Sequence, residues 1–276
     1  MTPSAQPVLP QRVLAIDTST DRMSVAVGAA GALPLVLHEA EGGAQASATL
    51  IPVIRQLLSS VGWRVADLDA LAFGCGPGAF TGLRTACAVV QGLAVAGRPE
   101  GIPVIPVHTL LAVAQMGLDA WLNTQARWPG GRITAVLDAR MDEMYVADVD
   151  VREPAQAGDG RVLTLTQPAL LCAPEALVTV SGWPRVSGQA PLLLAGNAAA
   201  VYGSRWPAPW QNVPQVDAWP TAAAVLRLSA QCWMADGVVA AADAQPLYVR
   251  DKVAQTTAER ELLKAARAAA TQGVQP

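Results

Sequence analysis

The feature that most constrains the fold is a short internal repeat. Residues 13–27, VLAIDTSTDRMSVAV, align without a gap with residues 134–148, TAVLDARMDEMYVAD. In each copy an apolar stretch ends at an aspartate, a short polar stretch follows, and a second apolar stretch begins, which predicts a β-hairpin. One such hairpin near the start of each half predicts a duplicated α/β protein, with coincidence in an Ala- and Val-rich chain as the alternative. The identical pairs are Asp17/Asp138, Asp21/Asp142, Met23/Met144, Val25/Val146 and Ala26/Ala147.

The remaining segments alternate between strand and helix patterns, as an α/β protein requires. Pro52 restricts the first helix to a late start or a kink. The stretch between residues 151 and 219 is rich in Pro and Gly and predicts only two short strands. The predicted strands lie within residues 31–40, 68–78, 101–109, 161–166 and 191–196, and the predicted helices within 45–63, 79–96, 110–122, 221–235 and 258–270.

Length and charge limit the class of protein. The 276 residues are enough for one large domain or two ordinary ones. A net charge of −3 offers no general basic surface, so we expect no strong binding of nucleic acid by this chain alone. The apolar run 86–96 falls far short of the ~20 residues that a membrane span needs. The first residues do not resemble a signal peptide, so we expect a soluble cytoplasmic protein with no membrane contact.

The metal-ligating residue types are few and scattered. Cys75, Cys87, Cys172 and Cys232 have no CxxC spacing, and the two histidines, His38 and His108, have no second ligand at helical spacing. Zinc and dithiol sites need such spacing, so we expect reduced thiols and no metal site.

A glycine-rich loop, AFGCGPGAFTGLRTA at residues 72–86, lies between a predicted strand and a predicted helix. A Walker loop has a lysine directly after its last glycine, but here Leu83 and Arg84 follow Gly82. Gly74, Gly76 and Ala79 match the letters of a dinucleotide fingerprint, but Pro77 interrupts the turn and no first-strand βαβ unit surrounds it. We therefore expect the glycines to let the helix begin close against the sheet.

The helix after this loop carries a single charge, Arg84, over residues 79–96. A helix with one face in water normally carries a polar stripe. We expect one face to pack on the sheet and the opposite face to receive a second helix, with burial inside the same chain as the alternative. The expected core face comprises Gly82, Ala86, Val89 and Leu93, and the opposite face comprises Ala88, Gln91 and Val95.

Four stretches resemble the TsaB (YeaZ) family, a subunit of the bacterial machinery for tRNA threonylcarbamoyladenosine. They are RVLAIDTSTDRMSVAV, LDALAFGCGPGAFTGLRTACAVVQGLA, VLDARMDEMYVA and AQPLYVRDKVA, and GPGAFTGLR is the most specific among them. The resemblance implies a duplicated actin/Hsp70-like (ASKHA, ribonuclease H-like) α/β fold of two subdomains. We place these at residues 1–110, which bind the partner, and 111–276.

The same resemblance implies a non-catalytic subunit. It pairs with a TsaD-type paralogue that carries the metal and the chemistry, and a TsaE-type ATPase joins them, so ATP, ADP and metal are expected in those subunits and none in this chain. The complex attaches a threonylcarbamoyl group to the adenosine next to the anticodon of ANN-reading tRNAs, so tRNA is met only through the complex. A homodimer of the isolated chain is left open. The expected partner interface comprises Leu50, Ile54, Leu57, Arg84, Ala88, Gln91 and Val95.

One departure from the family concerns metal binding. Many relatives have a histidine before the first long helix, where this chain has Ala46. The paired histidines that hold the metal in TsaD have no counterpart here, which strengthens the expectation that this chain binds no metal.

Two alternative functions stay open. The first is a nucleotide-dependent small-molecule kinase of the same fold, with a vestigial nucleotide contact at Asp17, Thr18 and Ser19. Against it, no lysine precedes Lys252, and Asp17 also suits a turn in which its carboxylate accepts backbone amides. The second is a peptidase, which needs a nucleophile and base or a metal that the two histidines do not provide.

Overall fold

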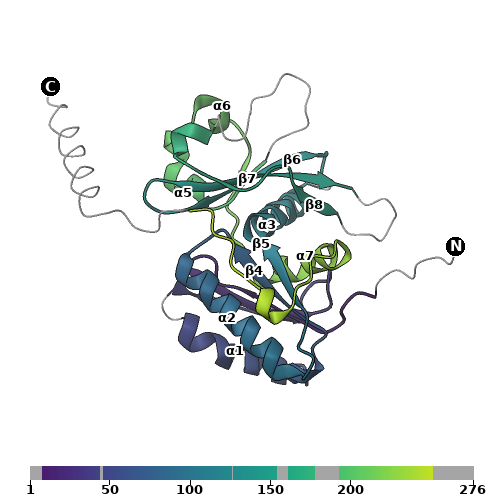
Figure 1. Cartoon of the computed structure of the whole chain (residues 1–276). Helices are drawn as coiled ribbons and strands as arrows, with labels where there is room; N and C mark the ends of the chain where they lie inside the picture. Colours follow the sequence, from purple (N-terminus) through teal and green to yellow (C-terminus); the bar gives the residue numbers. More distant parts are fainter. Residues whose placement is uncertain (1–7, 44–45, 126, 154–160, 178–192, 251–276) are drawn as a thin grey trace, which may run out of the picture.

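The computed structural model describes residues 8–43, 46–125, 127–153, 161–177 and 193–250. Two mixed β-sheets, each with helices, make up the molecule (Figure 1). Two helices, α3 and α7, lie between the sheets, and the other helices cover the outer faces (Figure 1).

The first sheet has the strand order β3-β2-β1-β4-β5. β2 and β3 run antiparallel to their neighbours, and β4 and β5 run parallel to β1. β1 and β2 form the first predicted hairpin, with Asp17 opposite Ser24. The strands are β1 Val13–Asp17, β2 Arg22–Gly28, β3 Val36–Glu41, β4 Ala70–Gly76 and β5 Val104–His108.

The second sheet repeats this arrangement in the order β8-β7-β6-β10-β11, with β9 also pairing with β7. β6 and β7 form the second predicted hairpin, and β10 and β11 run parallel to β6. The matching order and strand directions confirm that the chain is a duplicated α/β protein. The strands are β6 Gly131–Asp138, β7 Met144–Arg152, β8 Val162–Leu165, β9 Leu170–Cys172, β10 Leu193–Ala195 and β11 Gln215–Val216.

The helices form three layers with the two sheets. α1 and α2 cover the outer face of the first sheet, α3 and α7 share a core with the inner faces of both sheets, and α5 and α6 cover the outer face of the second (Figure 1). The α-helices are α1 Ala46–Ser60, α2 Phe80–Gly97, α3 Thr109–Thr124, α5 Ala198–Tyr202, α6 Ala208–Gln211 and α7 Ala222–Met234. The 3-10 helices are η2 Val65–Asp67, η3 Pro174–Ala176, η4 Gly203–Arg205 and η5 Ala241–Asp243.

The apolar stripe of α1 is part of the core. Leu50, Ile54 and Leu57 are at most 4% exposed and pack with the strands of the first sheet. The prediction that these three side chains belong to a partner interface is therefore corrected, because their own sheet already covers them. α1 begins at Ala46, six residues before Pro52, so the late start of this helix that the proline made possible is not observed.

The apolar stretch of α2 is longer than residues 86–96. Over Phe80–Gly97 it is the one helix in the described part of the chain that is long and apolar enough to cross a membrane. Leu83, Ala86, Val90 and Ala94 are buried, and the last three pack with the core of the first sheet, so about a third of this stretch (33%) is buried within the protein. Leu93, expected on the core face, is only half-buried.

Two expectations about organisation stay predictions. The helix at residues 258–270 lies outside the described residues. The boundary at residue 110 falls in the first turn of α3, and α7 from the second half packs on the first sheet.

Candidate functional site

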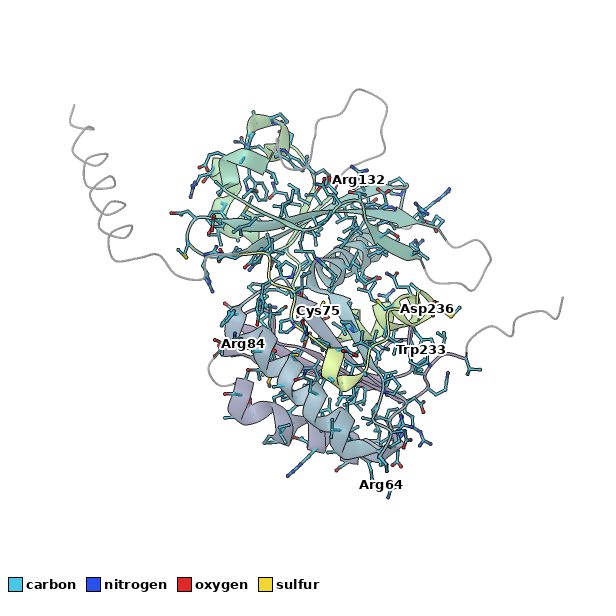
Figure 2. The ribbon with its side chains drawn as sticks, in the orientation of Figure 1. Arg64, Cys75, Arg84, Arg132, Trp233 and Asp236 are labelled. Atoms are coloured by element: carbon cyan, nitrogen blue, oxygen red, sulfur yellow. The ribbon has the colours of Figure 1, made fainter. Side chains whose placement is uncertain are left out.

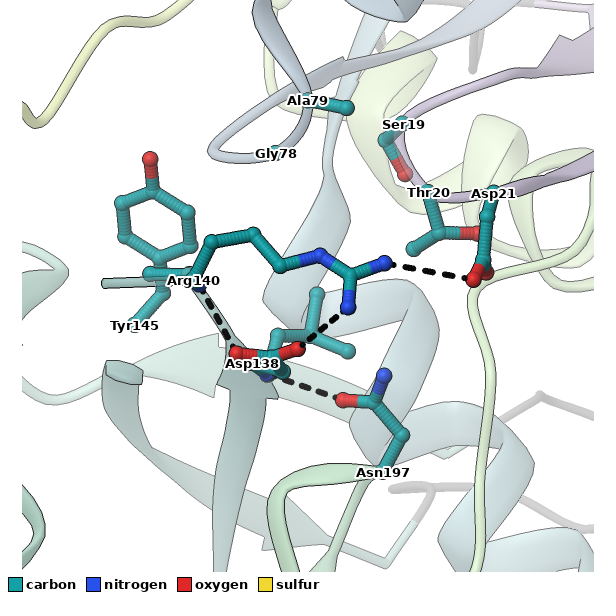
Figure 3. Close-up of a pocket in the computed structure, with 11 residues that line it drawn as sticks. Ser19, Thr20, Asp21, Gly78, Ala79, Asp138, Arg140, Tyr145 and Asn197 are labelled. Carbon is teal, nitrogen blue, oxygen red and sulfur yellow. Dashed lines mark hydrogen bonds and ion pairs between the residues drawn. The ribbon is translucent and has the colours of Figure 1, made fainter. Parts of the chain in front are cut away.

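The turns of the two hairpins face each other across a small cleft. The cleft holds a cavity of about 80 Å³ (Figure 3). Small-molecule sites usually have about 300–1,000 Å³, so this cavity is small for a nucleotide. It is lined by Ser19, Thr20, Asp21, Gly78, Ala79, Leu137, Asp138, Ala139, Arg140, Tyr145 and Asn197.

Asp17 ends β1 and holds the first turn. Its Oδ1 accepts hydrogen bonds from the backbone N–H of Ser19 at 3.0 Å and from the Ser19 hydroxyl at 2.8 Å. Its Oδ2 is buried against Gly74 and has no hydrogen-bond partner among the described residues. Burial raises the pKa of this carboxyl to about 6. The turn-forming role considered from the sequence is therefore present.

Asp138 occupies the equivalent position in the second hairpin and accepts the equivalent backbone hydrogen bond. Its Oδ1 accepts the backbone N–H of Arg140 at 2.8 Å and the Tyr202 hydroxyl at 2.9 Å. The side chain is 6% exposed. The two aspartates of the repeat thus share one local function, which is to accept the amide two residues later.

The Arg140 side chain spans the cleft between the turns (Figure 3). One guanidinium nitrogen lies 3.2 Å from Asp138 Oδ2 and another lies 3.4 Å from Asp21 Oδ2. Arg140, Met141 and Asp142 all have a backbone φ near +60°, a region that residues other than glycine rarely adopt. The second turn is thus held in an unusual conformation that aims an arginine at the first turn.

Arg140 is not among the site residues predicted from the sequence, although the repeat contained a signal. At the constant offset, Arg140 corresponds to Ser19, so one copy has a small hydroxyl where the other has a long cation.

The glycine-rich loop packs directly on the first turn. A Cβ at Gly82 would overlap the carbonyl oxygen of Thr18, and one at Gly78 would overlap that of Ser19. The Thr18 hydroxyl donates to the Gly82 carbonyl at 2.7 Å, and the Ala79 N–H donates to the Ser19 carbonyl at 2.7 Å. The glycines therefore allow close backbone contact, as expected. The hydroxyls of Thr18 and Ser19 both donate within the protein, and both residues are 1% exposed.

The outer face of α2 is open in part. Ala88 is exposed and Val95 is 70% exposed, as their predicted position requires. Arg84, labelled in Figure 2, is exposed and donates from Nε to the Tyr248 hydroxyl at 3.1 Å. Gln91 is half-buried and donates from Nε2 to the Ala244 carbonyl at 3.0 Å. Two of the four predicted residues on this helix therefore contact their own chain.

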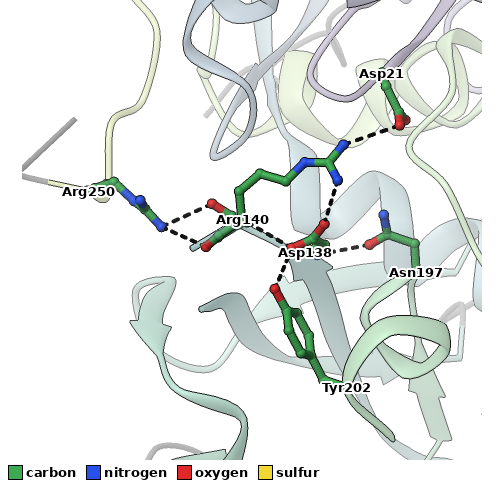
Figure 4. Close-up of polar contacts among 7 residues, drawn as sticks. Asp21, Asp138, Arg140, Asn197, Tyr202 and Arg250 are labelled. Carbon is green, nitrogen blue, oxygen red and sulfur yellow. Dashed lines mark hydrogen bonds and ion pairs between the residues drawn. The ribbon is translucent and has the colours of Figure 1, made fainter. Parts of the chain in front are cut away.

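These contacts come from residues 244–250, here named the C-terminal strap. The Leu247 N–H donates to the Cys75 carbonyl at 2.7 Å, which fixes the strap against β4. At the other end Arg250 lies 2.6 Å from Glu143. Arg250 also donates to the carbonyls of Ala139 at 3.0 Å and Arg140 at 3.3 Å, in the second hairpin turn (Figure 4). The strap thus connects α2 with the second hairpin turn.

The stretch AQPLYVRDKVA marks the strap through the family resemblance, but no local pattern predicted its contacts, because they join segments far apart in the chain. The bond between Arg84 and Tyr248 spans 164 residues.

The histidines and cysteines lie apart. His108 caps α3, with Nδ1 accepting the Leu110 N–H at 3.2 Å, and burial lowers its pKa to about 4. His38 lies on the edge strand β3. All four cysteines are free thiols, and among the described residues no three His, Cys, Asp or Glu side chains gather as metal ligands would.

Comparisons with known proteins agree with this architecture. The family model described as TsaD, tRNA N6-adenosine threonylcarbamoyltransferase, matches residues 36–203. The tRNA threonylcarbamoyladenosine biosynthesis protein TsaB of Haemophilus influenzae is 31% identical over 248 residues, which are 87% of this chain and 94% of that protein. The protein of the same name from Escherichia coli is 28% identical over 254 residues, 88% of this chain and 96% of that protein.

A solved structure, YeaZ from Pseudomonas aeruginosa, superposes with a TM-score of 0.66 at 32% identity, covering 86% of this chain and 99% of the other. These relatives confirm the predicted duplicated actin-like α/β fold, which the two equivalent sheets display. Extensive coverage at this identity, together with the repeated hairpins and the glycine-rich loop, shows that the chain belongs to the TsaB (YeaZ) family.

Proposed function

We propose that this chain is a non-catalytic subunit that pairs with a TsaD-type paralogue for threonylcarbamoyl transfer to the adenosine next to the tRNA anticodon. The observation that carries the non-catalytic part is the position of Arg140. It lies between the two hairpin turns, where an actin-like enzyme would place phosphate and Mg²⁺, and it pairs with Asp21 and Asp138.

The chemistry of the two aspartates favours the same conclusion. Asp138 already accepts hydrogen bonds from Arg140 and Tyr202. Asp17 is buried between Ser19, which donates to it, and Gly74, which packs against it. A general base or a metal ligand needs an accessible lone pair at the reacting atoms. Asp17 does not line the cleft cavity, and both oxygens of Asp138 are already paired with other groups of the protein.

The outer face of α2 is the surface that we assign to the partner. Ala88, Gly92, Val95 and Ala96 are exposed along it, and a Cβ built at Gly92 meets open space. Small side chains in a row let a second helix approach closely. α1 and α2 carry no acidic residue, and their charges are Arg55 and Arg84. The face thus offers a weakly charged, basic surface to a helical partner.

The remaining parts of the proposal concern the other components. The TsaD-type subunit and a TsaE-type ATPase supply the metal and the ATP or ADP sites. tRNA binds through the complex, because a chain with net charge −3 has little electrostatic attraction for phosphates. Whether the isolated chain forms a homodimer stays an open part of the proposal.

The decisive experiment is co-purification with the TsaD-type paralogue from the same organism, followed by tRNA modification with each subunit omitted. We expect stable pairing and no modification when this chain is left out. Ala88→Arg should abolish co-elution, because it places a long cation where two helices meet. Leu35→Arg, at a leucine that is 64% exposed, is the matched control and should pair normally. Unimpaired pairing and modification by Ala88→Arg would refute α2 as the partner surface.

The kinase and peptidase alternatives have a separate test. The isolated chain should show no turnover of ATP or peptides. Phosphate release that disappears in Asp17→Ala would favour the kinase instead.

A further inference from the structure

A second cavity lies at the N-terminal end of α2, between this helix, the second hairpin turn and the C-terminal strap. Its volume is about 220 Å³. A dry cavity of about 150 Å³ already accommodates benzene, so this one has room for a single large apolar side chain. Its apolar lining comes from Phe80, Met141, Tyr145, Leu247 and Tyr248, and Arg140 and Arg250 also line it.

The rim of this cavity is unusually apolar for a surface. Met141 and Tyr248 are each 44% exposed, and Leu247 is 38% exposed. They come from two segments a hundred residues apart in the chain, yet they border one cavity. Exposed apolar groups that converge on a cavity, rather than scatter singly, mark a contact site.

Arg84 stands beside this rim with unused hydrogen-bonding capacity. Its guanidinium lies 3.8 Å from the Phe80 ring centroid, and Nε donates to the Tyr248 hydroxyl. Within the described part of the chain its two terminal nitrogens have no hydrogen-bond or ion-pair partner. The ring of Phe80 and the hydroxyl of Tyr248 therefore hold the guanidinium in one orientation, with its terminal donors free for a carboxylate.

The charges around Arg84 favour a negatively charged group as its binding partner. α1 and α2 together contain no Asp or Glu, so nothing on this helical layer competes for the guanidinium. A guanidinium with no acidic neighbour on its own helical layer fits an acidic group on the partner.

We propose that this cavity and Arg84 form an anchor site for the paralogous partner, taking one large apolar side chain with an adjacent carboxylate. The proposal rests on the proposed function, since it extends the α2 surface to the strap and the second turn. The apolar side chain fills the cavity against Phe80 and Tyr248, and the carboxylate receives the terminal N–H groups of Arg84. Buried anchors of this kind carry much of the affinity of protein interfaces.

The test measures the dissociation constant of the full chain for the TsaD-type paralogue at about 50 and about 300 mM salt, between which the Debye length falls about 2.5-fold. Arg84→Gln should weaken binding at least about tenfold at low salt and flatten the salt dependence, because the charge pair is gone. Tyr248→Glu supplies a carboxylate to Arg84 within the same chain and should weaken binding similarly. Arg152→Gln removes the same charge from an exposed arginine that does not line the cavity and is the matched control, with near-normal affinity expected.

A photo-crosslinker at Leu247 identifies the occupant directly. We expect crosslinks to a partner peptide that contains a large apolar residue next to Asp or Glu. Wild-type affinity in both Arg84→Gln and Tyr248→Glu, or crosslinks confined to peptides without a carboxylate, would overturn the anchor site. If Ala88→Arg abolishes pairing while those two variants bind normally, the proposed function stands and the anchor site fails. If Ala88→Arg also binds normally, the proposed function fails with it.

Discussion

The hydroxyl of Thr18 donates to the carbonyl of Gly82 at 2.7 Å, although the two residues are 64 positions apart. This bond joins the first hairpin turn to the first turn of α2. Because a Cβ at Gly82 would overlap the Thr18 carbonyl, the contact exists only with glycine at that position. The glycine-rich loop is thereby explained as a close packing of two backbones.

Two glycines of α2 should respond in opposite ways to alanine. Gly82→Ala should destabilise the protein by more than about 2 kcal/mol, because turn and helix must separate. Gly92→Ala should stabilise it by about 0.5–1 kcal/mol, since a Cβ there meets open space and glycine weakens a helix interior. Urea denaturation of both variants measures the difference. Equal effects would contradict the packing of the loop on Thr18.

The buried carboxyl of Asp17 should make stability depend on pH. Its pKa is about 6 in the folded protein and near 3.8 when unfolded, so the native state binds more protons between these values. Ionising the buried carboxyl costs free energy, so the free energy of unfolding falls as pH rises from about 4 to about 6. Above about pH 6 this loss stays constant.

Asp17→Asn removes this dependence at nearly constant shape. Relative to wild type, the variant should gain about 1–3 kcal/mol between pH 4.5 and 7.5, measured by denaturant unfolding. A stability difference that stays level across this pH range would show that the carboxyl is not buried as described.

The N-cap of α3 should contribute an opposite dependence. Burial lowers the pKa of His108 to about 4 from an ordinary 6.5, so the native state binds fewer protons between these values. The contribution of neutral His108 to the free energy of unfolding is complete above about pH 6.5 and is lost as pH falls toward 4. His108→Asn keeps a cap for the Leu110 N–H and should lose this acid sensitivity. Thermal unfolding between pH 4.5 and 7 tests this, and a variant as acid-sensitive as wild type would refute it.

The two side chains that pair with Asp138, Tyr202 and Arg140, should contribute differently to the free energy of unfolding. Tyr202→Phe removes a buried hydrogen bond to a carboxylate and should cost about 1.5–3 kcal/mol. Arg140→Gln removes an ion pair whose arginine is 73% exposed and should cost less than about 1 kcal/mol. Unfolding free energies of the two variants decide this, and a larger loss for Arg140→Gln would mean that the cleft is drier than its exposure indicates.

Much of the fold followed from local patterns. The repeated hairpins, the strand before the glycine-rich loop and the helices at α2, α3 and α7 were predicted because alternation, helical spacing and glycine signals operate over a few residues. The same locality explains an error. The stripe of Leu50, Ile54 and Leu57 has the spacing of either a core face or a partner face, and only the sheet beneath α1 shows that it is core.

The sequence by itself determined the duplicated plan and the turn-forming aspartates, since each depends on neighbours within one hairpin. Only the tertiary structure decided that Arg140 reaches Asp21 across the cleft and that Tyr248 meets Arg84 on α2. These contacts join segments that approach only after both sheets and the strap have packed, so their formation depends on the arrangement of the whole chain. No short pattern encodes such a pairing, because its geometry is set by long-range packing and not by local propensity.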